Sequence, residues 1–188
     1  MLYACTLTAY ELRRIDRCLT EEHRTLLRIT GGAHTDHPAG RVLWRRDGAD
    51  VLIRTPVPLV DASNLVRVVD ASARDKAKAG VFTLRLRAAP SVKRSQPGRA
   101  NSRRQALDGF LALEWFARQA ERAGMRVLDG RIGMKACPAS RDGRNVRFLR
   151  LDFEAQVDVI DVVVAAAALA SGIGPHRAWG CGLGVLVS

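Results

Sequence analysis

Glycine is concentrated near the C-terminus, where five of the sixteen glycines fall between Gly172 and Gly184. Glycine adopts positive φ angles and lets another backbone segment approach closely. An apolar, helix-like run at residues 162–170 precedes this stretch, and an apolar run at residues 183–187 follows it. The pattern predicts a connection between a helix and a strand. It is not a dinucleotide-binding fingerprint, because that motif follows a strand and opens a helix.

Two interpretations of this glycine-rich loop follow from its residues. Backbone amides of such a loop, together with Arg177 and His176, suit an oxyanion such as a phosphate. The alternative is a tight turn that is needed only for packing. The loop alone does not decide between them, so the rest of the chain has to supply the other parts of any site.

The first half of the chain is predicted to run in the order strand, helix, strand, strand, helix, strand. An alternating strand at residues 2–8 is followed by a helix that ends at Gly31 and Gly32 and begins either near Asp16 or at Thr20. Asp47 and Gly48 are typical of a hairpin turn. The hairpin strands are predicted at residues 41–46 and 50–55. A short helical turn at 61–64, a strand at 66–69 and a linker at 71–80 follow them.

The second half repeats this order. Its clearest alternation covers residues 146–158, and residues 81–88 alternate with Arg85 and Arg87 facing outward. A helix at 103–123 is predicted to bury the stripe Ala106, Phe110, Leu113, Ala117 and Ala120. A loop is predicted at residues 90–102, a strand at 125–128 and a second loop at 137–145. Asp161 is predicted to cap a helix of small residues at 162–170, which the glycine-rich loop and a last strand follow.

This repeated order predicts an α+β fold of two tandem ferredoxin-like (βαββαβ, RRM-like) domains with a cleft between them. The N-terminal domain is expected at residues 1–77. The C-terminal domain, with the glycine-rich loop, is expected at residues 78–188.

The charge of the chain indicates a polyanionic partner. Its formal net charge is +11 and its sequence pI is about 10.7, which makes nucleic acid the first candidate. A membrane is the weaker candidate, because the sequence holds no uninterrupted apolar run of about twenty residues. The N-terminus does not resemble a secretory signal, and we expect a cytoplasmic protein.

Composition also narrows the kind of site. Aromatic residues make up only 5% of the chain, so we expect contacts to RNA phosphates and RNA shape rather than base stacking on a sheet. The four cysteines lack the spacing of a zinc site or a disulfide framework, and no clustered carboxylates resemble a two-metal nuclease. We therefore expect buried reduced thiols, no metal ion and no small-molecule cofactor.

His23 is the histidine that the pattern favours for chemistry. It lies four residues after Leu19 and three before Leu26, which places it on the inward or cleft face of its helix. His34 and His37 fall in a loop rich in Gly, Pro and Asp and are predicted to lie at the surface.

Three stretches resemble the CasE family of CRISPR repeat-processing endoribonucleases, a subunit of type I-E Cascade complexes. The first is Glu22-His23-Arg24-Thr25-Leu26-Leu27, similar to a histidine motif in the first helix of that family. The second runs from Phe82 to Pro90 as FTLRLRAAP. The third is the glycine signature from Gly172-Ile173-Gly174-Pro175 to Gly180-Cys181-Gly182-Leu183. Two departures are Thr20, where relatives often carry a tyrosine, and Ala89, where they usually carry an asparagine.

The resemblance implies a metal-independent endoribonuclease that cuts precursor CRISPR RNA at the repeat hairpin and stays bound to its product with other Cascade subunits. Cleavage by 2′-hydroxyl attack needs a group that exchanges protons near pH 7 and fixed positive charge on the phosphorane. We assign the first role to His23, as general acid or base. Arg177, with the loop from Gly172 to Gly182, is assigned the second.

An RNA-binding surface is predicted from basic side chains and from the glycine-rich loop. Its members are Arg24, Arg85, Arg87, Lys93, Arg94, Arg99, Arg103, Arg104, Arg141, Arg144, Arg147, Gly172, Gly174, His176, Gly180 and Gly182. Two other functions stay open at this point. One is a non-catalytic subunit that binds an RNA hairpin, and the other is a ferredoxin-like scaffold that contacts only protein.

Overall fold

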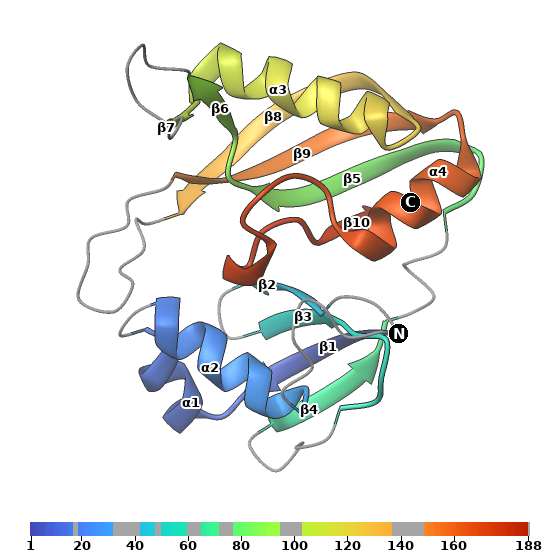
Figure 1. Cartoon of the computed structure of the whole chain (residues 1–188). Helices are drawn as coiled ribbons and strands as arrows, with labels where there is room; N and C mark the ends of the chain where they lie inside the picture. Colours follow the sequence, from blue (N-terminus) through green and yellow to red (C-terminus); the bar gives the residue numbers. More distant parts are fainter. Residues whose placement is uncertain are drawn as a thin grey trace.

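The computed structural model describes residues 1–16, 19–31, 42–47, 50–59, 65–71, 77–94, 103–136 and 149–187. Figure 1 shows two α+β domains, one above the other in this view. Each contains a four-stranded antiparallel sheet. The two tandem ferredoxin-like domains predicted from the sequence are therefore present. The predicted boundary at residues 77 and 78 lies between β4 and β5 and stays a prediction.

The N-terminal domain carries one sheet and the helices α1 and α2. Its elements are β1 (Leu2–Leu7), α1 (Ala9–Ile15), α2 (Leu19–Ile29), β2 (Leu43–Asp47), β3 (Asp50–Arg54) and β4 (Leu65–Asp70). The strand order is β2-β3-β1-β4. The register between β2 and β3 pairs Asp47 with Asp50, as expected for the predicted hairpin. The helical turn predicted at residues 61–64 lies outside the described residues.

The helical region is divided into two helices rather than one. Thr8 ends β1 in an extended conformation, and its side chain accepts a hydrogen bond from the Glu11 backbone N–H, which starts α1. A second helix then begins at Leu19. His23 consequently lies in the second turn of α2. Neither predicted helix start, near Asp16 or with Thr20 as the capping residue, matches these bounds.

The C-terminal domain has the same strand arrangement. Its elements are β5 (Gly80–Ala88), β6 (Ser91–Arg94), β7 (Arg103–Ala106), α3 (Gly109–Arg122), β8 (Met125–Ala136), β9 (Arg150–Val159), α4 (Val162–Ser171), the 3₁₀ helix η2 (Arg177–Trp179) and β10 (Gly184–Val187). The sheet order is β10-β5-β9-β8. When the strands of each sheet are counted along the chain, the first and third are central and the second and fourth form the edges in both domains.

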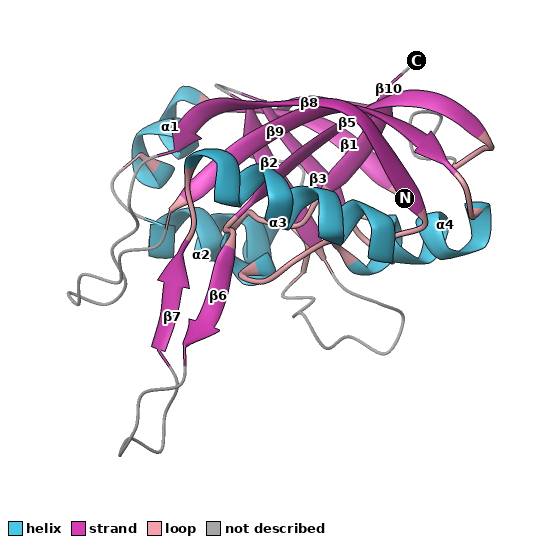
Figure 2. Cartoon of the chain, turned by 90° about the horizontal axis from the view of Figure 1, so that it is seen from above, coloured by secondary structure: helices cyan, strands magenta, loops and turns pink. Residues whose placement is uncertain are grey.

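Two predictions for this domain were wrong. The segment predicted as a loop contains β6, and the first residues of the predicted helix form β7, so that α3 begins six residues later than expected. β6 and β7 pair as a two-stranded antiparallel ribbon, which extends away from the body of the domain in Figure 2. The predicted stripe on α3 was right at Ala120 and Leu113, which lie in or against the core, but wrong at Phe110, which is exposed. The buried face is Ala112, Trp115, Phe116 and Ala120.

The alternation predicted for the long central strand is confirmed over β9. Leu151, Phe153, Ala155 and Val157 are buried and pack against α3 and α4 in one core. Asp161 caps α4 by accepting a hydrogen bond from the Val164 backbone N–H, as predicted. No helix within the described ranges is long and apolar enough to cross a membrane.

The two domains share a small apolar interface and a buried arginine. Leu183, just before β10, and Val185, within β10, pack in one cluster with Leu2 and Leu43 of the N-terminal domain. Arg54 at the end of β3 is 5% exposed and donates hydrogen bonds to the backbone oxygens of Leu169 and Gly184. The interface thus fixes the N-terminal sheet against β10 and the end of α4.

Candidate active site

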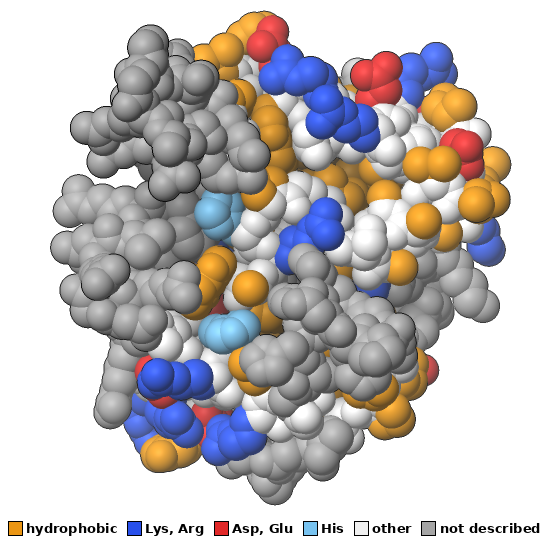
Figure 3. All heavy atoms as spheres, in the orientation of Figure 1, with side chains coloured by type: hydrophobic (Ala, Val, Ile, Leu, Met, Phe, Trp, Pro, Cys, Tyr) orange, Lys and Arg blue, Asp and Glu red, His pale blue; other side chains and the backbone are white. Residues whose placement is uncertain are grey.

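His23 lies where the two domains meet. Its imidazole is half-buried, and its ring centroid is 5.4 Å from that of Trp44 on β2. On another side the centroid of Trp179, in η2 of the other domain, is 5.2 Å away. The rings are tilted by 33° and 42°. α2 therefore presents His23 to the glycine-rich loop, and histidine side chains are visible on the face that both domains form in Figure 3.

The glycines of this loop are required by its backbone and by close packing. Gly172, Gly174, Gly180 and Gly182 all have positive φ angles, between 71° and 91°. A Cβ atom at Gly174 would lie 2.8 Å from the Trp115 ring, and one at Gly180 would lie 3.1 Å from Trp44 Nε1. Packing is thus a sufficient reason for these glycines, and their predicted contact with phosphate stays a prediction.

Arg177 is placed by the same glycines. The aliphatic part of its side chain packs over Gly172 and Gly182. A Cβ atom added to Gly172 would lie 3.3 Å from Arg177 Cδ, and one added to Gly182 would lie 3.1 Å from Arg177 Cγ. Its Nε donates a hydrogen bond of 2.9 Å to the Gly174 carbonyl. His176 has φ 59° and is the single non-glycine residue with positive φ among the described residues. Its carbonyl accepts from the Trp179 N–H at 2.9 Å, which closes η2.

Arg150, at the start of β9, connects α2 to this loop. Arg150 Nη1 lies 3.4 Å from a Glu22 carboxylate oxygen and 3.4 Å from the Trp179 carbonyl oxygen. The side chains of Arg150 and Glu22 are only 12% and 6% exposed. Glu22 directly precedes His23 on α2, and Trp179, whose carbonyl Arg150 also contacts, lies against the imidazole.

Buried polar atoms without a hydrogen-bond partner also gather here. They include Thr20 Oγ1, Trp44 Nε1 and Arg150 Nε. Such atoms are rare in folded proteins and call for an explanation. Thr20 lies one helical turn before His23, so the first departure from the family resemblance belongs to the same neighbourhood.

Burial is the main influence on the Cys181 thiol, which also lies in this loop. Burial raises the pKa of Cys181 to about 12, while Arg150 and Arg87 act in the opposite direction. Cys181 is fully buried, as expected, and so is Cys5, whose pKa burial raises to about 11 with help from Asp50. Both thiols are reduced, as predicted. Cys18 and Cys137 lie outside the described residues.

Of the two predicted RNA-binding arginines on β5, Arg85 faces outward as predicted, but the prediction was wrong for Arg87, whose side chain is only 11% exposed because it lies against the other domain. Arg85 donates to Glu154 at 3.0 Å. Arg87 binds Asp152 through Nε and Nη2 at 2.7 and 2.8 Å, and its Nη1 donates to the Arg46 carbonyl across the domain boundary at 2.7 Å. Burial opposes the charge of Arg87, but the hydrogen bond and attraction to Asp152 raise its pKa overall. Arg87 is thus a structural link between the domains as well as a candidate RNA contact.

The other basic candidates are spread over the molecule. Arg24 is exposed on α2, one residue after His23, and pairs with Glu21 at 3.0 Å. The β6–β7 ribbon pairs Lys93 with Arg104 and Arg94 with Arg103 in its backbone register. Four further candidates, and the two histidines predicted to lie on a surface loop, fall outside the described residues: Arg99, Arg141, Arg144, Arg147, His34 and His37.

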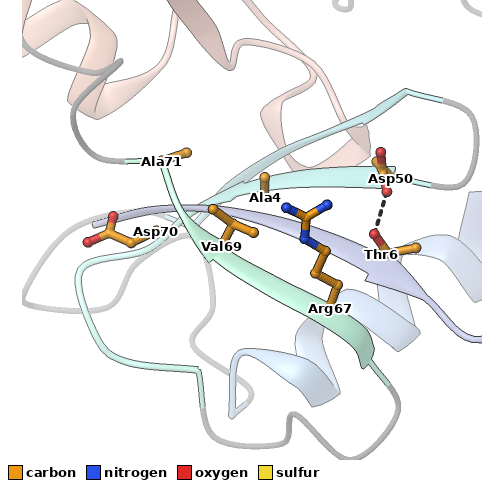
Figure 4. A pocket seen from close by; sticks show the side chains of 7 residues that line it. All are labelled: Ala4, Thr6, Asp50, Arg67, Val69, Asp70 and Ala71. Carbon is orange, nitrogen blue, oxygen red and sulfur yellow. Dashed lines mark hydrogen bonds between the residues drawn. The ribbon is translucent and has the colours of Figure 1, made fainter.

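Several pockets of the described residues lie apart from His23, and two of them are rich in charged side chains. One of about 210 Å³ lies on the N-terminal sheet and contains Arg67, Asp70 and the hydrogen-bonded pair Thr6 and Asp50 (Figure 4). A wider one, of about 710 Å³, lies between β2 and the C-terminal sheet and is lined by charged residues that include Arg45 and Glu154. In the described part of the chain, no group of three or more His, Cys, Asp or Glu residues is arranged to hold a metal ion.

Sequence reasoning brought His23, Arg177 and the glycine-rich loop to one site, but it missed three residues there. Trp44 and Trp179 contact the imidazole, and Arg150 pairs with Glu22, the residue before His23. The position of Trp179 inside the glycine-rich loop was the one available signal. Arg150 and Glu22 are 128 residues apart, and no local pattern relates them.

Known proteins resemble this chain over nearly its whole length. CRISPR-associated endoribonuclease Cse3 of Thermus thermophilus is 27% identical over 191 residues, which cover 87% of each chain. The structure of CRISPR endoribonuclease Cse3 bound to 19 nt RNA matches with a TM-score of 0.83 and 25% identity, covering 100% of this chain and 99% of the other.

A further structural match has the same fold at lower identity. It is a chain of a CRISPR RNA-guided surveillance complex, with a TM-score of 0.68 and 19% identity over 100% of this chain and 99% of the other. The family model described as CRISPR associated protein matches residues 6–186. These findings confirm the resemblance stated from the sequence, and the chain belongs to the CRISPR associated protein family.

Proposed function

We propose that this protein is a metal-independent endoribonuclease that cuts precursor CRISPR RNA at the repeat hairpin. The observation that carries the proposal is the contact between His23 and η2. A side chain that exchanges protons near pH 7 lies against the 3₁₀ helix that carries Arg177, although the two belong to different domains. The likeness to Cse3, an endoribonuclease with a structure bound to RNA, supports the choice of substrate.

The proposed reaction is a transesterification within the RNA. The 2′-oxygen of the nucleotide before the cut bonds to phosphorus while the bond from phosphorus to the 5′-oxygen breaks. The 2′-hydroxyl gives up its proton to a base, and the leaving 5′-oxygen receives a proton from an acid. The products are a 2′,3′-cyclic phosphate and a 5′-hydroxyl.

His23 carries one of these proton transfers, which typically contributes about 10²- to 10⁴-fold to the rate. Arg177 and the backbone amides of the glycine-rich loop hold the negative charge that grows on the phosphate oxygens. Thr20 has no phenol to offer as a second acid or base. We therefore expect positioning of the 2′-hydroxyl to supply more of the acceleration in this chain.

RNA binding is assigned to basic groups around this site and along the β6–β7 ribbon. Arg24 follows His23 directly, and the backbone register of the ribbon pairs Lys93 with Arg104 and Arg94 with Arg103. The other candidates named from the sequence remain part of this proposed surface. The match to a chain of a CRISPR RNA-guided surveillance complex supports a further proposal, that the protein stays on its product with other Cascade subunits.

The test is cleavage of hairpin repeat RNA in EDTA, with analysis of the product ends. We expect a 2′,3′-cyclic phosphate, and no cut when the nucleotide before the cleavage site carries 2′-deoxyribose. His23→Ala should abolish cutting while leaving RNA affinity nearly unchanged. His37→Ala, which removes an imidazole from a predicted surface loop, is the matched control and should cut normally. A product with a free 3′-hydroxyl would contradict the mechanism.

One observation favours a second candidate, a non-catalytic subunit that binds the RNA hairpin. Thr20 occupies the place of the tyrosine found in relatives, and its hydroxyl is buried without a hydrogen-bond partner. This candidate predicts tight, salt-sensitive binding of the repeat hairpin with no cleavage between about pH 5 and pH 9. The EDTA experiment, repeated over that range, separates the two.

A further inference from the structure

Arg150 links two elements that the proposed chemistry needs at a fixed distance. It opens β9, and its Nη1 lies 3.4 Å from Glu22 Oε2 on α2 and 3.4 Å from the Trp179 oxygen in η2. α2 carries His23 and η2 carries Arg177. A single guanidinium therefore contacts both supports of the site, from a third element that carries neither group.

These contacts form a closed circuit around the imidazole. Glu22 is adjacent to His23 in the chain, Arg150 contacts Glu22 and the backbone of Trp179, and the Trp179 ring lies 5.2 Å from the His23 ring. Because the circuit crosses the domain boundary, a shift of α2 against η2 has to break one of its contacts.

Burial makes this circuit resistant to rearrangement. Arg150 and Glu22 are nearly excluded from solvent, so that neither charge can exchange its partner for water at low cost. The backbone is also held close at this point. An added Cβ on Gly180 would lie 3.5 Å from Arg150 Nη1 and 3.1 Å from Trp44 Nε1. The guanidinium thus fits a space that Gly180 leaves open.

We propose that Arg150 and Glu22 are positioning residues, which hold His23 at its working distance from the glycine-rich loop. The proposal rests on the proposed function, since it concerns where the catalytic imidazole stands. It assigns no contact with RNA to either residue. Their effect is therefore expected on the cleavage step rather than on RNA affinity.

The kinetic test compares Arg150→Met, Arg150→Lys, Glu22→Gln and the double variant Arg150→Met with Glu22→Gln. Single-turnover cleavage of a hairpin repeat gives the rate of the chemical step, and a hairpin with 2′-deoxyribose before the cut gives the Kd. Arg150→Met should lower the rate by about 10- to 100-fold, because small misplacements of a catalytic group have effects of that size. Its Kd should change by less than about threefold.

Two further results identify the pair. The double variant should be no slower than the slower single variant, because both changes break one circuit. Arg150→Lys, which keeps a charge beside Glu22, should recover part of the rate. The control is Arg126→Met on β8, whose partner Asp158 lies 2.9 Å away in an exposed pair, and it should behave as wild type. The proposal would be overturned if the rate losses of Arg150→Met and Glu22→Gln added up in the double variant. It would also be overturned if the variants weakened RNA binding, seen in the Kd, without slowing cleavage.

A measurement without substrate separates this proposal from the proposed function and checks that each variant is folded. In the proton NMR spectrum, the His23 ring signals should be displaced by the ring currents of Trp44 and Trp179. Arg150→Met should collapse that displacement while other dispersed signals remain, and Arg126→Met should not. Suppose that Arg150→Met loses the displacement of the His23 signals and that the wild-type protein cuts no RNA. The positioning role of Arg150 would then stand, while the proposed nuclease function would be refuted. A displacement that persists in Arg150→Met would refute the positioning role.

Discussion

The ring centroids of His23 and Trp179 lie 5.2 Å apart, although the two residues belong to different domains and are separated by most of the chain. The contact places the proposed proton-transfer group, on α2, against the 3₁₀ helix that carries the proposed phosphate-binding arginine. Any change that loosens the domain interface should consequently act on the chemistry as well as on stability.

The glycine-rich loop should tolerate no side chain at Gly174. Gly174→Ala brings a Cβ to 2.8 Å from the Trp115 ring at a φ of 84°, so overpacking should add about 1–3 kcal/mol to the cost of backbone strain. Gly109→Ala is the matched control, because its φ is 52° and no atom lies within 4 Å of its added Cβ. Urea denaturation measures both free energies of unfolding. Equal losses in the two variants would contradict the packing assignment.

Arg54 should be a main support of the domain interface. Arg54→Met removes the donors to the Leu169 and Gly184 oxygens, and we expect the free energy of unfolding to fall by about 2–4 kcal/mol. Arg67→Met on the exposed face of β4 is the control and should cost less than about 1 kcal/mol. Chemical denaturation followed by tryptophan fluorescence measures the difference. A loss no larger than that of the control would mean that Arg54 is dispensable.

Cys181 should resist alkylation in the folded protein and reduce stability at alkaline pH. Burial raises the pKa of its thiol from 9.0 to about 12, so the folded chain keeps the proton over a range in which the unfolded chain loses it. The resulting contribution to the free energy of unfolding is complete below pH 9 and falls as the pH rises toward 12.

Two measurements check this assignment for Cys181. Mass spectrometry after iodoacetamide treatment at about pH 8 should find the thiol unlabelled unless urea is present. Cys181→Ala should flatten the alkaline part of the stability profile when it is compared with wild type. Rapid labelling of the native protein would show that the loop opens readily.

The β6–β7 ribbon should contribute phosphate contacts to RNA binding. Replacing Arg103 and Arg104 together by Gln should weaken binding of the repeat hairpin and lower the slope of log affinity against log salt by about 1.4–1.8. Arg118→Gln on α3, where the arginine pairs with Glu114 one turn away, is the control and should leave the slope unchanged. Fluorescence anisotropy at several salt concentrations gives both slopes, and an unaltered slope in the double variant would remove the ribbon from the interface.

Secondary structure could be predicted from the sequence where a single hydrophobic periodicity, or a clear capping residue, marked the segment. Alternation in β9 and the capping residue Asp161 gave the central strand and the start of α4. The β6–β7 ribbon escaped prediction because both of its strands are short and consist largely of polar residues, so that no apolar alternation marks them. On α3 the stripe was partly misplaced because several apolar positions, among them Phe110 and Leu111, are exposed.

The candidate site was predictable only where motifs are local. His23 and the glycine-rich loop each stand out in a short stretch, and the resemblance to a family joined them. Trp44 reaches the imidazole from β2 of the same domain, and Arg150 reaches α2 through the packing of one domain on the other; no spacing along the chain records either contact. Arg87 looked like a free cation in its strand, yet Asp152 and the Arg46 carbonyl engage it.

The place of β10 in the interface has a consequence for biosynthesis. The segment from Gly172 to Val187 completes the C-terminal sheet, packs on Leu2 and Leu43, and supplies the residues that face His23. A ribosome makes this segment after every other described part of the molecule. A nascent chain therefore carries its imidazole well before that imidazole can meet the proposed phosphate-binding loop, and the proposed RNA cleavage should be withheld until translation has passed Val187.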